Sequence, residues 1–219
     1  MSPVPNSDDP LREVRERLLD AAERVFYAHG IQAVGMDRLR TVSGVPLKRI
    51  YQLYSRKDEV VRAFLRRRHD RMMGTLAGYV AGADGPEQRV YALFDWLYDW
   101  FGEPDFRGCA WMNAYGELGP ANAAVTAEVH RHKDAFRELV TGTVREAGYP
   151  AVVADAVYLL VEGAVVAAQL RKDTGPAQEA RRGAEILLRA APGPPGRTMA
   201  GSGPDARREA ADTGHLPGS

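Results

Sequence analysis

The fold is decided by the stretch TVSGVPLKRIYQLYSRKDEV, which occupies residues 41–60. Gly44 supplies the permissive backbone that a tight turn needs. Pro46 can begin a helix, because its missing N–H would have no partner in the first turn. The stretch therefore predicts a short helix over Met36–Ser43, a turn, and a second short helix over Pro46–Leu53. Two short helices around a glycine turn indicate a helix-turn-helix.

Helical periodicity flanks this stretch on both sides. Apolar residues at helical spacing predict a helix from Leu11 to His29, and a glycine follows as its stop. On the other side, Ser55 is expected to cap a fourth helix that runs to about Met73. That helix carries Arg62 and the run 66–68, which favour a solvated or ion-paired face over direct DNA contact.

Five further helices are expected in the rest of the chain, separated by Gly and Pro breaks. Their predicted ranges are 86–101, 107–118, about 122–147, 151–170 and about 176–191. No window alternates apolar and polar residues with period two, and no internal repeat is visible. The predicted fold class is therefore all-α.

The segment 151–170 is the most apolar of the chain. Its strongly polar residues, Asp155, Glu162 and Gln169, recur every seven positions and so lie close to one line along a helix. A membrane span has this length. Two aligned carboxylates and many small residues nevertheless favour a helix buried between protein partners, so no membrane association is expected.

Composition and charge point to a soluble protein whose N-terminal part, residues 1–73, binds an anionic partner. The 219 residues are 45% hydrophobic and 26% charged, which is typical of globular domains. Residues 1–73 carry 15 Lys and Arg against 10 Asp and Glu, whereas residues 74–219 carry 14 against 19. Nucleic acid is the first candidate partner for an N-terminal region with this excess of basic residues. No export signal opens the chain and its single cysteine is Cys109, so a cytoplasmic location is expected.

The domain organisation follows from these patterns. Residues 1–10 are Pro-rich, and residues 192–219 combine Gly, Pro, Ala and charge with almost no large apolar side chain. Both segments are expected to be disordered, because they cannot offset the entropy of ordering. Residues 11–57 are expected to form the helix-turn-helix domain, and residues 58–191 a larger helical domain.

The helix-turn-helix stretch has the residue types of a DNA-contacting surface. Arg49 and Gln52 have the chemistry for base readout in the major groove. Lys48, Tyr51 and Lys57 suit contacts to phosphates. On charge alone, a solvated basic turn between two helices explains the segment equally well.

The same block resembles the motif of the TetR family of transcriptional regulators. The resemblance rests on Ser43-Gly44-Val45, Ile50-Tyr51, Tyr54 and Lys57, preceded at the right distance by a helix that ends in His29-Gly30. It covers about residues 11–68 and implies that the operator contacts are Lys48, Arg49, Tyr51, Gln52 and Lys57. Gly35-Met36 stands where the family often has Ser or Thr, and Leu53 where it has His or Tyr, so one or two phosphate contacts are expected to be missing.

A second, looser resemblance concerns the C-terminal part. The segment Phe106–Ala114, which contains the sequence FRGC, and the helix after Asp155 are similar to C-terminal domains of one branch of that family. Such domains bind small, usually hydrophobic effectors between helices and dimerise through their last two helices, here about 151–171 and 176–191. The resemblance implies an N-terminal three-helix DNA-binding domain followed by a helical ligand-binding and dimerisation domain. It also implies a homodimeric repressor, released from a palindromic double-stranded operator by a small molecule of unknown identity.

An aromatic cavity with a few polar groups is the expected effector site. The candidate ligand-binding residues are Trp96, Trp100, Trp111, Met112, Asn113, Tyr115, Tyr158 and Glu162. Aromatic side chains at helical spacing are more often plain core, so a structural role competes for each of them. Glu162 is the strongest candidate, because a carboxylate in so apolar a helix must be paired, hydrated or protonated.

Cysteine and histidine have structural explanations that compete with functional ones. Cys109 beside Arg107 has the features of a redox-sensitive thiol, but a buried inert cysteine is the more frequent case. His130 and His132 suggest a metal site, yet two residues apart on a helix they point to different sides. A solvated face is therefore expected for the two histidines, and no metal or cofactor is expected.

Two other functions compete with a regulator. The first is a helical ligand-binding dimer whose DNA head is degenerate, which the Gly35-Met36 departure keeps open. The second is a hydrolase that uses Cys109 or a histidine. The chain has no nucleophile elbow, zinc-binding His-Glu-x-x-His, phosphate loop or dinucleotide fingerprint. The sequence therefore predicts a protein that is not an enzyme.

Overall fold

The structure, a computed structural model, describes residues 10–191, except for the side chains of Pro10 and Pro120. The two segments expected to be disordered, 1–10 and 192–219, lie outside the described residues, apart from residue 10, which is the first residue of a helix.

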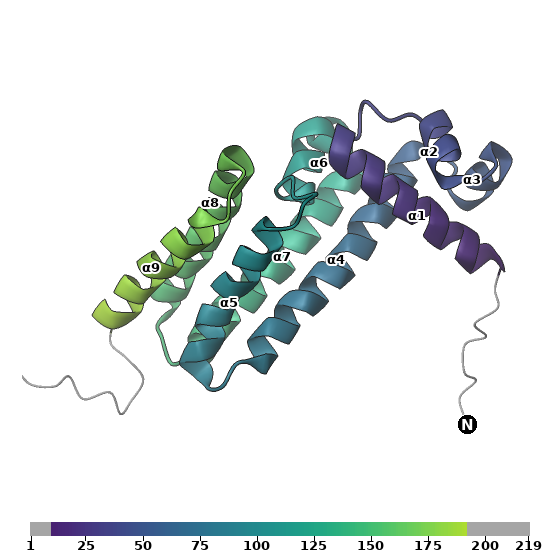
Figure 1. The fold of residues 1–219 in the computed structure, drawn as a ribbon. Helices are drawn as coiled ribbons and strands as arrows, with labels where there is room; N and C mark the ends of the chain where they lie inside the picture. The colour runs from purple at the N-terminus through teal and green to yellow at the C-terminus, as the bar shows by residue number, and fades with distance from the viewer. Residues whose placement is uncertain (1–9, 192–219) are drawn as a thin grey trace, which may run out of the picture.

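The described part of the chain is built from α-helices and one short 3-10 turn, and it contains no strand, which confirms the all-α prediction (Figure 1). The elements are α1 (Pro10–His29), α2 (Met36–Ser43), α3 (Leu47–Leu53), α4 (Lys57–Gly82), α5 (Pro86–Phe101), α6 (Ala110–Leu118), the 3-10 turn η1 (Gly119–Ala121), α7 (Ala123–Glu146), α8 (Ala151–Arg171) and α9 (Gly175–Ala190). Helices α1 to α3 form a head at one end of the molecule, and the longer helices form its body.

The head owes its shape to a few backbone positions. Gly44 adopts the left-handed conformation at φ +66° and ends α2, where its N–H donates to the carbonyl of Arg40. A side chain at this φ would be strained, which is why glycine suits the turn. Pro46 then precedes α3 as its N-cap residue. Leu39 and Ile50 are fully buried, so apolar packing holds α2 to α1 and α3 to α2.

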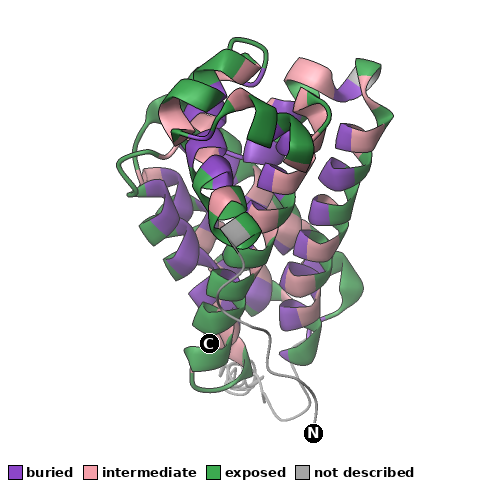
Figure 2. Cartoon of the chain, turned by 90° about the vertical axis from the view of Figure 1, so that its right-hand side faces the viewer, coloured by how far each residue is buried: buried purple, intermediate pink, exposed green. Residues whose placement is uncertain are grey.

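The body places α4, α5 and α7 side by side, with α8 and α9 as a pair alongside them (Figure 1). Buried residues line the inner faces of these helices, and exposed residues the outer faces (Figure 2). One hydrophobic cluster extends without interruption from Leu18 in α1 to Leu188 in α9. The head and the body therefore share one continuous core.

Helix α4 differs from its predicted form at both ends. It continues to Gly82 rather than to about Met73, because Leu76 is buried in contact with the core and packing overrides the low helix propensity of nearby glycines. Ser55 does not cap the helix. Its N–H donates to Glu59 Oε2 at 2.7 Å and its hydroxyl to Glu59 Oε1 at 3.1 Å, and Arg56 is the N-cap residue.

Helix α6 begins at Ala110 rather than at Arg107. The N–H of Arg107 donates to the Tyr27 hydroxyl at 2.8 Å, and that hydroxyl donates to the Gly108 carbonyl at 2.7 Å. Gly108 is left-handed at φ +80°, and a Cβ there would lie 2.0 Å from Gln169. The backbone of this segment is therefore committed to a contact with α1, which excludes it from the helix.

Helix α8 buries Val157, Val161 and Val165 in the body, and a polar line and an exposed apolar line run beside this buried face. The polar line faces the body: Asp155 pairs with Arg137 at 2.9 Å, and Glu162 pairs with Lys133 at 2.7 Å. The apolar line, which includes Leu159 (67% exposed), stands in solvent. Among the described residues, α8 is the one helix long and apolar enough to cross a membrane, and 39% of its most apolar window is buried.

Candidate nucleic-acid interface and its junction with the body

Helix α3 presents a compact polar surface. Ile50 is fully buried under the helix, whereas Lys48, Arg49 and Gln52 are exposed and Tyr51 is 49% exposed. An Arg49 Nη1 donates to Gln52 Oε1 at 3.0 Å, so these two side chains lie together. Both types can form paired hydrogen bonds with base edges, which makes this surface suited to the major groove.

Lys57, the fifth predicted DNA contact, lies apart from the other four at the start of α4. It is only partly exposed, and its Nζ donates to the carbonyl of Gln32 at 3.4 Å. Burial lowers the pKa of Lys57, opposed by the nearby carboxylate of Glu117. This ammonium is therefore held against the loop between α1 and α2.

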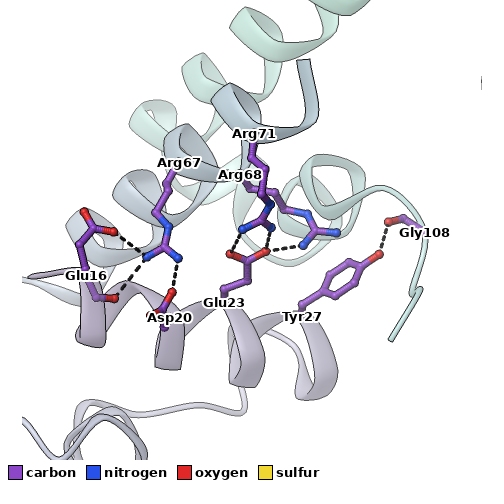
Figure 3. A network of polar contacts seen from close by, with 8 residues as sticks. All are labelled: Glu16, Asp20, Glu23, Tyr27, Arg67, Arg68, Arg71 and Gly108. Carbon is purple, nitrogen blue, oxygen red and sulfur yellow. Dashed lines mark hydrogen bonds and ion pairs between the residues drawn. The ribbon is translucent and has the colours of Figure 1, made fainter. Parts of the chain in front are cut away.

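Ion pairs fasten α1 of the head to α4 (Figure 3). Arg67 pairs with Asp20 and also with Glu16 at 3.2 Å. Arg68 pairs with Glu23 at 2.6 Å, and Arg71 binds the same carboxylate. Burial alone would raise the pKa of Glu23, but the hydrogen bonds and charges of the two arginines outweigh it and lower the pKa.

The arginine cluster of α4 is therefore ion-paired, as the sequence indicated. Its remaining members turn to α7, where Arg66 pairs with Glu128 and Arg62 lies 3.8 Å from the same carboxylate. Arg131 completes the group at 3.0 Å from Glu128. Burial raises the pKa of Glu128, but the arginines outweigh that effect and lower it.

Glu117, which no sequence pattern singled out, joins the body to the head. Its Oε1 accepts the N–H of Ile31 at 3.0 Å, and its Oε2 accepts the N–H of Gln32 at 2.8 Å. The Gln32 side chain donates back to the Glu117 carbonyl. Gly30 is left-handed at φ +85°, and a Cβ there would lie 3.2 Å from the carboxylate. We name this contact between Glu117 and residues 30–32 the junction clamp.

The predicted ligand-binding residues do not line a single cavity. Trp96 and Trp100 stack with ring centroids 5.1 Å apart and border a cleft of about 290 Å³ between α4 and α5. Met112 and Asn113 line another cavity, of about 520 Å³, between α1, α4, α6 and α8. Tyr115 is 40% exposed and lines neither of the two.

The other predicted ligand residues have protein partners. Trp111 is fully buried and stacks on His132 with centroids 3.4 Å apart. Lys133 Nζ donates to both carboxylate oxygens of Glu162, at 2.8 and 2.7 Å, so the carboxylate is paired. Burial raises the pKa of Tyr158 to about 12, helped by Glu162.

The expectation of a solvated face is wrong for His132. His130 is exposed, but His132 is 1% exposed and points into the body. Its Nδ1 lies 3.0 Å from Nδ1 of His69 on α4, so one ring carries the shared proton and the other accepts it. Burial lowers the pKa of His132 to about 2, with Lys133 the next contribution. The spacing of the two histidines correctly placed them on different sides, but only packing shows which side is inside.

Cys109 is free and buried, in agreement with the structural explanation of this residue. Among the described residues, no three His, Cys, Asp or Glu side chains are grouped as a metal site would need.

A helix-turn-helix head that exposes the polar surface of α3, fixed to a larger helical body, is the architecture of a class of transcription regulators. Residues 86–184 match the family model described as Tetracyclin repressor-like, C-terminal domain. A TetR-family transcriptional regulator from Streptomyces coelicolor shares 29% of residues over 81% of this chain and 95% of its own, with a TM-score of 0.75. Residues 86–184 are thus similar to TetR-like C-terminal domains, and the described chain has the fold of TetR-family transcriptional regulators.

Two further relatives extend the comparison. The HTH-type transcriptional activator FasR from Mycolicibacterium smegmatis is 33% identical over 99 residues, which span 45% of this chain and 45% of that protein. The matched segment thus covers less than half of the length of that curated relative. A TetR transcriptional regulator from Chloroflexus aurantiacus has the same fold, with a TM-score of 0.71 and 22% identity over 82% of this chain and 96% of its own.

Proposed function

We propose that the protein is a cytoplasmic, sequence-specific DNA-binding repressor whose homodimer occupies a palindromic operator. The observation that carries the proposal is the exposed surface of α3, where Lys48, Arg49, Tyr51 and Gln52 stand clear of the head while Ile50 anchors the helix. In this assignment Arg49 and Gln52 contact base edges, and Lys48 and Tyr51 contact phosphates.

Lys57 is proposed to contribute to DNA binding mainly through the loop between α1 and α2. Its ammonium already contacts the Gln32 carbonyl, so it stabilises the loop and reaches a phosphate only at the edge of the interface. We therefore expect Lys57 to contribute less to operator affinity than Lys48.

The homodimer is proposed to form through α8 and α9. On α8, the side chains of Val152, Leu159 and Val166 recur every seven residues and are 72%, 67% and 55% exposed. Ile186 extends this apolar surface onto α9, where it is 68% exposed. A second copy that brings the same two helices would bury both surfaces by two-fold symmetry. A membrane is the competing occupant of α8, and the paired charges of Asp155 and Glu162 along the same helix argue against it.

The body is proposed to bind a small-molecule effector that lowers operator affinity. The effector would stabilise an orientation of the head that no longer fits two successive major grooves, with a coupling free energy of about 1–3 kcal/mol. Domain limits of 11–57 for the head and 58–191 for the body follow from this proposal. Helix α4 belongs to both parts functionally, since it starts beside the recognition helix and ends among the body helices.

The experiment that tests the proposal selects bound sequences from a random DNA pool at two salt concentrations, because phosphate contacts are salt-dependent. An inverted repeat is expected. Arg49→Ala and Tyr51→Ala should abolish its binding and leave the dimer intact, whereas the control Arg145→Ala, at the far end of α7, should bind as the wild type does. A folded dimer that selects no sequence would instead support the ligand-binding protein with a degenerate head. The absence of a side-chain cap at Gly35 keeps that alternative in view.

A further inference from the structure

The cavity between α1, α4, α6 and α8 differs from the expected aromatic effector site. We name it the junction cavity; its volume is about 520 Å³, which lies within the range of small-molecule sites, about 300–1,000 Å³. The apolar part of its wall consists of Phe26, Ile31, Phe64, Ala110, Met112 and Ala114. Of these six residues, only Met112 is substantially exposed. Met112 is 48% exposed, so part of this apolar wall is open to solvent.

The polar side chains that line the cavity already form hydrogen bonds within the protein, and one of them, named below, keeps free donors. The Tyr27 hydroxyl serves the backbone of residues 107 and 108. Both carboxylate oxygens of Glu117 accept backbone N–H groups. Asn113 donates to the Arg107 carbonyl and accepts from Gln169.

The exception is the guanidinium of Arg107. It is exposed at the rim of the cavity and makes one hydrogen bond, to the carbonyl of its own neighbour Phe106, at 2.8 Å. The remaining N–H donors of the Arg107 guanidinium have no carboxylate partner among the described residues. An apolar wall with a cation at its rim fits a ligand that has an apolar body and a single anionic head.

We propose that the junction cavity binds an amphiphilic monoanion, with its apolar part among Phe26, Phe64 and Met112 and its carboxylate or equivalent group on Arg107. The proposal rests on the proposed function in one respect, since it takes the occupant to be the effector of a DNA-binding regulator. Binding itself needs only the cavity and Arg107.

An occupant of this cavity acts directly on the head. Gly30 and Ile31 line the cavity together with Gly116 and Glu117, so both partners of the junction clamp border the ligand. A ligand that displaces either side by the length of a hydrogen bond removes the clamp and frees the loop between α1 and α2. We expect a change in operator affinity of about 5- to 150-fold, the usual range for coupled sites.

The test uses three probes of one shape and different charge: octanoate, octanol and octylammonium. Each is titrated into the full-length protein by isothermal calorimetry. Octanoate is expected to bind with saturation, and octylammonium to bind more weakly than octanol. Arg107→Gln is expected to weaken octanoate by about ten-fold, the size of one charge-assisted hydrogen bond, and to leave octanol unchanged.

Two further variants locate the site. Gly116→Leu places a side chain at the cavity wall, where its Cβ would meet nothing within 4 Å. Octanoate should bind this variant at least ten-fold more weakly, provided that its circular dichroism spectrum matches that of the wild type. Arg145→Gln removes an exposed guanidinium on α7 and should bind octanoate as the wild type does. Wild-type affinity for octanoate in Arg107→Gln and Gly116→Leu, tighter binding of octylammonium than of octanoate, or no saturable binding of octanoate would each overturn the proposal.

The DNA selection described above, run on the same preparation, separates the two proposals. Selection of an operator without octanoate binding rejects the junction site and leaves the regulator intact. Arginine-dependent octanoate binding by a dimer that selects no DNA rejects the regulator and retains the site.

Discussion

The junction clamp gives a prediction whose size can be worked out from the structure. Glu117→Gln keeps the shape of the side chain but leaves one acceptor oxygen for two backbone N–H groups, those of Ile31 and Gln32. A hydrogen bond to a charged group contributes about 1.5–3 kcal/mol, and Glu117 is partly exposed, so the lower limit applies. The loss is therefore about 1.5 kcal/mol, which lowers protection of these two amides from hydrogen exchange by about ten-fold.

Hydrogen exchange monitored over residues 30–34 measures this change directly, because it reports local opening of the loop. The control is Glu146→Gln, at the exposed end of α7, which should leave the loop unchanged. Glu117→Asp should give an intermediate result, since it keeps the charge and shortens the reach. Wild-type protection of residues 31 and 32 in Glu117→Gln would refute the assignment of Glu117 as the residue that holds the loop.

Three further outcomes are expected. Lys48→Ala should weaken operator binding about equally for all sequences and reduce the slope of log affinity against log salt by about 1, as measured by fluorescence anisotropy. Leu159→Glu should give a monomer in sedimentation velocity, because it puts a charge in the apolar surface of α8, whereas Ala77→Glu on the exposed side of α4 should remain a dimer. The lowered pKa of His132, about 2, means that between about pH 6.5 and 2 the unfolded chain binds more protons than the folded one, so stability falls on acidification. Urea unfolding should show a loss of about 1 kcal/mol from pH 6.5 to 5.5 and none from pH 8 to 7, and His132→Phe should flatten this dependence; an equally steep curve in the variant would contradict it.

The sequence by itself determined the helical class, the order of the helices and the polar, exposed character of the α3 surface. These features depend on local rules: glycine and proline at turns, apolar spacing along a helix, and polar side chains around one buried Ile50. The ends of α5 also followed from local chemistry, since Pro86 begins it and the break at Gly102 follows it. Such rules need no knowledge of what each helix packs against.

Only the tertiary structure decided how the head joins the body. The bonds from Glu117 to the loop and from Tyr27 to Gly108 connect residues more than 80 positions apart, and no local pattern reports such a pairing. The same holds for His132, whose inward direction depends on Trp111 of another helix. The predicted ligand residues separated into different cavities for this reason as well: helical spacing shows which side chains share a face, whereas the packing of several helices determines which faces enclose the same space.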